Sequence, residues 1–146
     1  MKLRNVATGT LVLTLLFFAG CGEGGPKGDP ASVAKQFLDR YYVQGNVEEA
    51  KALATGDMAK KMGEEFALLA KAVPRDQGKS YEVSYTLGEQ FREGNHAYQL
   101  YQVVLKPKEG DPIYKKVALS IDAVEKDWLI TQFDEAPGSP DQTIKH

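Results

Sequence analysis

The sequence predicts an α+β domain in which three helices pack on one face of a curved antiparallel sheet of about four strands. Two observations support this fold class. Apolar residues recur at helical spacing between residues 30 and 73, and at a period of two between residues 81 and 133. This region of roughly one hundred residues is long enough for one hydrophobic core and too short for two domains.

Three helices are expected before the first strand. Asp29-Pro30 supplies an N-cap followed by a proline in the first turn, and the helix that it opens stops at Gly45-Asn46. The same asparagine forms a capping-box pattern with Glu49 and starts a short second helix. A third helix opens at Asp57 and ends before Pro74, because a residue before proline avoids helical backbone angles. The apolar stripes are Val33, Phe37, Leu38, Tyr41 and Tyr42 in the first helix, and Met58, Met62, Phe66, Leu69 and Val73 in the third.

Four strands are expected after the helices, at residues 81–87, 96–105, 114–124 and 128–133. Gly88 is a candidate bulge after the first strand. Gly94-Asn95 is a hairpin signal between the first two strands, and Glu125-Lys126-Asp127 turns the chain into the last one. Strands that follow one another with short turns predict an antiparallel meander.

The N-terminus has the three parts of a secretory signal. Lys2 and Arg4 form a positive start, residues 11–18 are an apolar run, and Ala19-Gly20 supply the small residues that precede a cut. The run is too short for a membrane span, which needs roughly 20 apolar residues. We therefore expect residues 1–20 to be removed as a signal peptide.

Cys21 is the only cysteine of the chain and follows this segment directly. The stretch Phe18-Ala19-Gly20-Cys21 resembles the lipobox of bacterial lipoproteins, with Phe where Leu is commonest. The resemblance implies that the thiol carries a diacylglyceryl group, and several acyl chains anchor a protein stably where one binds marginally. Gly22 stands where many inner-membrane lipoproteins carry Asp. The expected location is therefore the periplasmic face of the outer membrane in a Gram-negative cell, or otherwise the outer face of the cell membrane. The alternative is a soluble secreted protein with a chance cysteine.

The segments that flank the domain at 30–135 are poor in regular structure. Residues 21–29 are a glycine-rich tether, and residues 136–146 form a loose tail. Loss of the signal peptide leaves 16 of the 18 basic residues against 20 acidic ones, a net charge of about −4. This acidic balance argues against nucleic acid as a partner and leaves the lipid on Cys21 as the contact with the membrane.

The order of elements resembles the nuclear transport factor 2-like superfamily, whose members have a cone-shaped, cystatin-like α+β fold. The resemblance rests on the opening helix with Phe37 and Tyr41-Tyr42 followed by residues 45–50, on the third helix ahead of all strands, and on the closing hairpin at 126–130. It covers Pro30 to about Glu135, and small bacterial lipoproteins of unknown function share the layout. Because the superfamily includes isomerases, dehydratases, polyketide cyclases and non-catalytic binding modules, the resemblance does not select an activity.

His96 is the only histidine within the expected domain. In an enzyme it would act as a general base inside the cone, with Asp122 or Glu89 as its partner. No paired carboxylate can be placed facing it from the sequence, and a turn at Lys126-Asp127 would pair Asp122 with Thr131 on the face away from the core. The simpler interpretation is a half-exposed histidine at a strand end.

Aromatic residues form the second candidate site. If Gly94-Asn95 is the turn, the tyrosines of the first strand share a face with Phe91, Tyr98, Leu100 and Val104. Such a wall with hydroxyl tips suits an apolar or lipid-like ligand, and the alternative is that these residues are simply core. The candidate ligand-binding residues are Tyr81, Tyr85, Phe91, Tyr98 and Trp128.

These patterns favour a membrane-anchored envelope lipoprotein with a non-catalytic domain that binds a small apolar ligand or a protein partner. Two alternatives stay open: an isomerase- or hydrolase-like enzyme that uses His96, and a structural protein that dimerises through its open sheet face. With Cys21 assigned to lipid and one histidine in the domain, no set of metal ligands can be assembled, so we expect no metal and no cofactor.

Overall fold

The structure is a computed structural model that describes residues 28–72 and 81–140, without the side chains of residues 69–72. The expected signal peptide and Cys21 lie outside the described residues. Helices come first: α1 (Pro30–Leu38), the π-helical turn η1 (Asp39–Val43), α2 (Val47–Lys51) and α3 (Gly56–Ala72). The strands that follow are β1 (Tyr81–Glu93), β2 (His96–Pro107), β3 (Ile113–Val124) and β4 (Asp127–Pro137).

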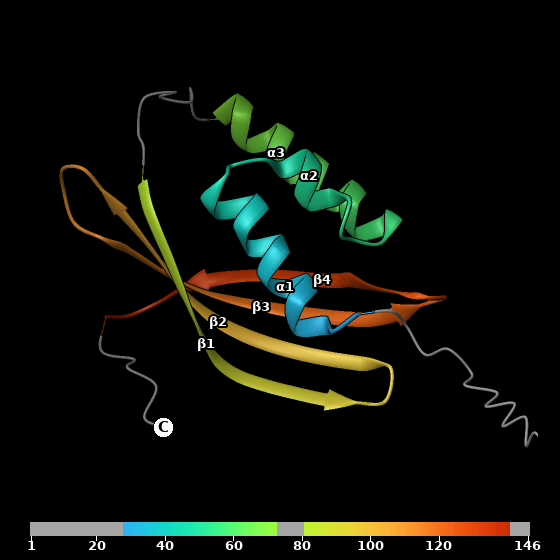
Figure 1. Ribbon diagram of the computed structural model, residues 1–146. Coiled ribbons are helices and arrows are strands. Elements are labelled where there is room, and N and C mark those ends of the chain that lie inside the picture. The colour runs from blue at the N-terminus through green and yellow to red at the C-terminus, as the bar shows by residue number, and fades with distance from the viewer. Residues whose placement is uncertain (1–27, 73–80, 141–146) are drawn as a thin grey trace, which may run out of the picture.

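The four strands form one antiparallel sheet in the order β1-β2-β3-β4. All three α-helices lie on the same side of this curved sheet (Figure 1). We call the side that faces them the inner face and the opposite side the outer face. In the part of the chain that the structure describes, no helix covers the outer face. The predicted α+β fold with helices on one face of a curved antiparallel sheet is confirmed.

The first helix continues without a break into a wider turn. Pro30 begins α1, and in η1 the backbone N–H of Gln44 donates to the carbonyl of Asp39 at 2.8 Å. Gly45, with a φ of +65°, then reverses the chain, so the stop expected at Gly45-Asn46 is found there. Wide turns of this kind are rare and often lie near functional or closely packed regions.

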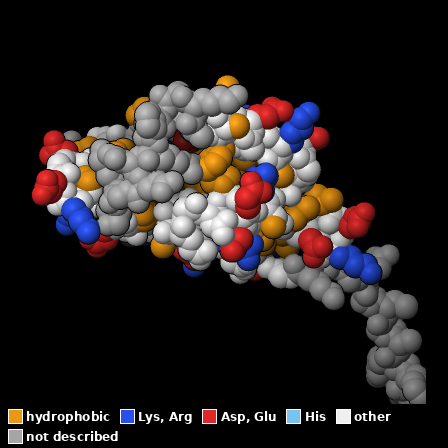
Figure 2. Space-filling view, turned by 90° about the horizontal axis from the view of Figure 1, so that it is seen from above, with side chains coloured by type: hydrophobic (Ala, Val, Ile, Leu, Met, Phe, Trp, Pro, Cys, Tyr) orange, Lys and Arg blue, Asp and Glu red, His pale blue; other side chains and the backbone are white. Residues whose placement is uncertain are grey.

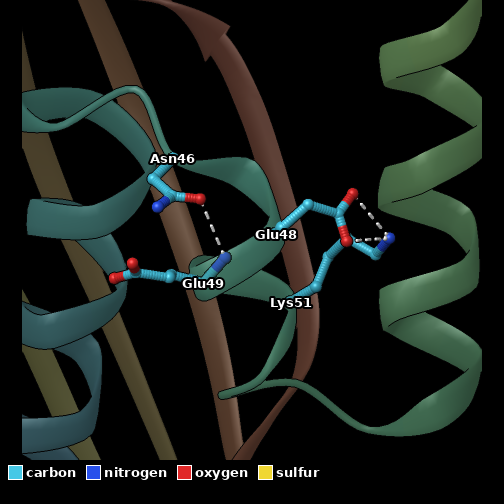
Figure 3. A network of polar contacts seen from close by, with 4 residues as sticks. All are labelled: Asn46, Glu48, Glu49 and Lys51. Atoms are coloured by element: carbon cyan, nitrogen blue, oxygen red, sulfur yellow. Dashed lines mark hydrogen bonds and ion pairs between the residues drawn. The ribbon is translucent and has the colours of Figure 1, made fainter.

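Asn46 caps α2 as the sequence predicts. Its side-chain oxygen accepts a hydrogen bond of 3.1 Å from the backbone N–H of Glu49 (Figure 3). The return bond of a capping box is absent from the described contacts, because the N–H of Asn46 donates to the carbonyl of Arg40 at 2.7 Å. Glu48 and Lys51 of the same helix form an ion pair at 3.0 Å. The cap fixes the angle at which α2 leaves the first helix.

The core lies between the helices and the inner face. Phe37 of α1 is fully buried, stacks on Tyr41 with ring centroids 5.7 Å apart, and meets the edge of Phe133 at 5.2 Å. The segment between α2 and α3 closes the free edge of β4, because the N–H of Ile130 donates to Leu53 and its carbonyl accepts from Thr55. The buried inner-face residues of the sheet are Ala97, Gln99, Tyr101, Val103, Val117, Leu119, Ile121, Trp128, Ile130 and Phe133.

Two bulges decide which strand residues face the helices. In β1 the pairing shifts from Leu87–Tyr101 to Glu89–Leu100, which leaves Gly88 as the extra residue, as expected. In β4 the extra residue is Thr131, between the pairs Ser120–Gln132 and Ile121–Ile130. Because side chains alternate along a strand, one inserted residue exchanges the faces on either side of it.

The end of β4 departs from the expected boundary between domain and tail. The strand includes Ala136 and Pro137, and the N–H of Gly138 then donates to the carbonyl of Tyr114 at 2.9 Å. The carbonyl of Ser139 accepts from the amide of Gln102 at 3.0 Å, on the outer face. The first residues of the expected loose tail are therefore bound to the sheet, and residues 141–146 lie outside the described part.

No helix in the described part of the chain is both long and apolar enough to cross a membrane.

Candidate functional site

The aromatic residues predicted to form one wall lie on two faces of the sheet. Tyr85 is paired with Val103 on the inner face, whereas Phe91 and Tyr98 are paired with each other on the outer face. The prediction of a shared wall is wrong because it carried the alternation of β1 through Gly88, where the bulge exchanges the faces. Tyr81 is an inner-face residue near the start of β1, and it lines an open hollow with Glu82 and Lys106.

The inner-face tyrosines belong to the core. The hydroxyl of Tyr85 donates to the carboxylate of Asp39 in η1 at 2.7 Å, and its ring meets Tyr101 edge-on at 5.9 Å. Burial, followed by the bond to Asp39, raises the pKa of Tyr85 to about 12. Trp128 packs in the same core with 3% of its surface exposed. These side chains fill the space in which an apolar ligand was expected.

Tyr101 donates its hydroxyl to the side-chain oxygen of Gln99 at 2.7 Å, within the buried inner face. Burial, followed by the negative charge of Asp29 before α1, raises the pKa of Tyr101 to about 12.

A polar cluster joins η1 to the sheet. The hydroxyl of Tyr42 donates to Glu135, whose Oε1 is 3.1 Å from Nζ of Lys115. The same ammonium lies 5.7 Å from the centre of the Tyr42 ring. Burial, followed by the charge of Glu135, raises the pKa of Tyr42 above its ordinary value. Because these groups pair with one another, the cluster fixes the helices to the sheet.

His96 pairs with Asp122, one of the two carboxylates that the sequence offers as its partner. Its Nδ1 lies 2.6 Å from Oδ1 of Asp122, and the hydroxyl of Thr131 donates to Oδ2 of the same carboxylate. The contact arises because the register of β2 and β3 places His96 opposite Asp122. The loop at residues 108–112 connects these two strands, and its sequence does not predict which residues of β2 and β3 are paired. The second candidate partner, Glu89, is paired with Leu100 on the outer face.

Asp122 lies on the outer face, as expected, but its partner on β4 is Leu129 and not Thr131. The difference follows from the turn, which is Glu125-Lys126, with Glu125 at a φ of +56°. The extra residue Thr131 nevertheless reaches the carboxylate with its hydroxyl. Burial opposes ionisation of Asp122, but the hydrogen bonds from Thr131 and His96 outweigh it and hold the pKa of Asp122 below its ordinary value.

His96 is a half-exposed histidine at a strand end, as in the simpler interpretation of the sequence, and it does not lie inside the cone as the alternative of a general base required. The histidine is on the outer face, and 47% of its side chain is exposed. A general base needs a bound substrate within hydrogen-bond reach, usually in an enclosed site. Over the two described ranges, no group of three or more His, Cys, Asp or Glu side chains is arranged to hold a metal ion.

The outer face carries apolar side chains that no described helix covers. Phe91 is the most exposed of them, at 56%, beside the partly exposed Tyr98. Acidic residues gather at the β1–β2 hairpin end of this face, and Lys106 and Lys116 lie toward the other end. We call the apolar set the outer patch; its members are Phe91, Tyr98, Leu100, Val104, Ala118 and Leu129.

The helix side of the molecule has a different surface. Figure 2 shows hydrophobic side chains between the helices, with acidic and basic ones spread around the rim.

The architecture defines an α+β domain with a nuclear transport factor 2-like fold. A solved structure with this arrangement is described as a calcium/calmodulin-dependent protein kinase type II association domain from Thiobacillus denitrificans. The two chains are 10% identical, the TM-score is 0.59, and the match covers 79% of this chain and 98% of that one. At this identity the likeness shows the fold alone. No protein-family model and no curated protein matches the sequence.

Proposed function

We propose that this protein is a lipid-anchored protein of the bacterial envelope whose domain is a non-catalytic association module. The observation that carries the association is the outer patch, centred on Phe91 and Tyr98, on a sheet whose inner face is packed against the helices. An exposed cluster of large apolar groups is typical of an interaction surface. The filled interior argues against the small apolar ligand, and the exposed position of His96 argues against the enzyme.

The partner that we propose is a second copy of this chain. The structural neighbour is described as an association domain, which favours this use of the fold. The outer face is acidic at one end, where Glu89 and Glu93 lie, and carries Lys116 toward the other end, where Lys106 is paired with Glu82. Two copies related by a two-fold axis that runs across the strands would place Glu89 and Glu93 of each copy near Lys116 of the other. Anchoring in one membrane would raise the local concentration of the partners.

Sedimentation of the full chain in detergent tests the association. Leu100 lies within the patch, and Leu100→Lys places a charge where two apolar surfaces would meet. We expect a dimer for the unsubstituted chain and a monomer for Leu100→Lys. Val43→Lys is the matched control, because Val43 is 52% exposed on η1, away from the sheet face, and it should leave the dimer intact. A strict monomer at high protein concentration would contradict the proposal.

The anchor rests on Cys21 and on the leader that precedes it. Mass spectrometry of the N-terminal peptide from native membranes should find diacylglyceryl on Cys21 and no residues 1–20. Cys21→Ser should lose the lipid, while Gly22→Ala should keep it. Recovery of the peptide without lipid, or still joined to its leader, would refute the anchor and leave the association test unaffected.

A further inference from the structure

A hollow of about 380 Å³ opens at one corner of the inner face, between the start of α1 and the adjoining ends of β1 and β2. We call it the corner pocket. Its walls are Asp29, Pro30 and Ala31 at the helix start, Gln90, Phe91 and Arg92 of β1, and Ala97 and Gln99 of β2. The pocket shares one residue, Phe91, with the outer patch and has its other lining residues outside that patch, so binding of a ligand here can be tested separately from the association proposed above.

The bulge at Gly88 gives the pocket its polar wall. Before the bulge, Tyr85 and Leu87 face the helices; after it, Gln90 and Arg92 do, opposite Gln99 and Ala97. Without the extra residue, the alternation would bring Phe91 inward and send Arg92 outward. One glycine thus exchanges a large apolar ring for a guanidinium and a carboxamide at this corner.

Gln99 brings a hydrogen-bond donor to the pocket that nothing in the fold uses. Its side chain is 3% exposed, and its Oε1 accepts from the hydroxyl of Tyr101 at 2.7 Å, which fixes the orientation of the carboxamide. The Nε2 of Gln99 has no acceptor among the residues that the structure describes, although the residue lines the hollow. Among the described residues the buried side-chain nitrogen without a partner is Nε1 of Trp128, so Nε2 of Gln99 is within reach of solvent and is free to donate to a ligand in the hollow.

The start of α1 adds a second donor. Pro30 has no N–H, and the N–H groups of Ser32 and Val33 both donate to the carbonyl of Asp29. The side chain of Asp29 does not cap the helix. Within the described contacts the N–H of Ala31 is therefore left without an acceptor, at the positive end of a helix dipole and in the pocket wall.

Two opposite charges border the same space. Nη1 of Arg92 is 3.9 Å from Oδ1 of Asp29, which is too long for a hydrogen bond, and more than half of each side chain is exposed. The guanidinium also lies 5.1 Å from the centre of the Trp128 ring, whose Nε1 is buried without a partner. Arg92 is thus held in place by the indole while its N–H donors remain available.

We propose that the corner pocket binds a small zwitterion of the amino-acid type. The carboxylate of the ligand accepts hydrogen bonds from Nε2 of Gln99, the N–H of Ala31 and the guanidinium of Arg92. Its ammonium group lies against the carboxylate of Asp29. A dianion such as phosphate is a poorer fit, because Asp29 repels it, and the volume suits a ligand at the small end of the usual range.

Chemical-shift mapping of the full ¹⁵N-labelled chain in detergent tests the proposal. The probes are glycine and L-alanine, with propionate and propylamine as ligands that carry only one of the two charges. We expect saturable shifts of the Gln99 side-chain amide and the Ala31 amide with both amino acids, and none at Tyr98 on the outer face. Each singly charged probe should bind at least about tenfold more weakly than the amino acids, because each lacks one charged contact.

Three variants assign the contacts. Arg92→Gln and Asp29→Asn should each weaken amino-acid binding about tenfold, and Gln99→Glu should do so while it keeps the bond from Tyr101. Glu93→Gln is the control, because Glu93 is next to Arg92 in sequence but faces outward. No saturable shift with either amino acid would overturn the proposal. Propionate binding as tightly as glycine, or binding that Arg92→Gln and Asp29→Asn leave unchanged, would overturn it as well.

Discussion

The inner and outer faces of the sheet are built from the same four strands, yet their side chains have different partners. On the inner face, Tyr101 is buried against Gln99 and Phe133 against Phe37. On the outer face, Phe91 is exposed beside Tyr98, and His96 pairs with Asp122 in contact with water. The inner face accounts for folding, so the apolar content of the outer face is available for binding. The predictions that follow test this separation.

The largest difference between the faces should appear when a phenylalanine is truncated on each. Phe37→Ala removes a fully buried ring and should lower the free energy of unfolding by about 3–5 kcal/mol, through lost transfer energy and a cavity. Phe91→Ala removes a ring that is 56% exposed and should cost less than about 1 kcal/mol in the monomer. Urea unfolding of both variants in the background of Leu100→Lys measures the two costs. Equal costs would show that the faces do not divide as described.

Alkaline pH should act on the inner face. The folded state raises the pKa of Tyr101 to about 12, whereas the unfolded chain ionises near its ordinary value of 10.0. The stabilisation is therefore complete below pH 10 and is lost as the pH rises toward 12, on the order of 2 kcal/mol for this residue. Urea midpoints between pH 8 and 11 measure the loss, and Tyr101→Phe should reduce the slope. A slope unchanged by that substitution would count against the buried tyrosine as its source.

The separation of the faces was only partly accessible from the sequence. Period-two alternation in β1 and the hairpin signal at Gly94-Asn95 predict the sheet correctly, and Gly88 was recognised as a candidate bulge. Alternation continued through Gly88 predicts Phe91 on the same face as Tyr85, whereas the bulge turns it to the outer face. A second bulge at Thr131 had no glycine or other local signal to mark it.

Local sequence patterns do not predict contacts between segments that are far apart in the chain. His96 meets Asp122 only because of the register between β2 and β3, and Tyr85 reaches Asp39 across the core. The corner pocket depends on both the bulge and the placement of α1, so neither Arg92 nor Gln99 was a candidate from the sequence. The sequence does contain one indication of a polar site here. A hairpin turn at Gly94-Asn95 pairs Gln90 with Gln99, which places two polar side chains opposite each other.

A smaller effect is expected from the polar pair on the outer face. The pKa of Asp122 is below its ordinary value of 3.8 in the folded state, so its stabilisation is present above that pH and is lost as the pH falls through the folded pKa. Because both side chains are in contact with water, Asp122→Asn should cost less than about 1 kcal/mol at neutral pH. Thermal unfolding at pH 7 and pH 3 should show a smaller acid loss in the variant than in the unsubstituted chain. An equal loss of stability in the variant and in the unsubstituted chain would show that Asp122 does not contribute to the effect of acid.

Oxidative footprinting of the full protein in its native membrane tests the central claim most directly, because it reports which aromatic side chains water reaches. Phe91 and Tyr98 should be protected in the unsubstituted protein and become reactive in Leu100→Lys, while Tyr81, which is 39% exposed and faces inward, should react equally in both. Equal reactivity of Phe91 and Tyr98 in the two proteins would mean that nothing covers the outer face, and would contradict its role in association.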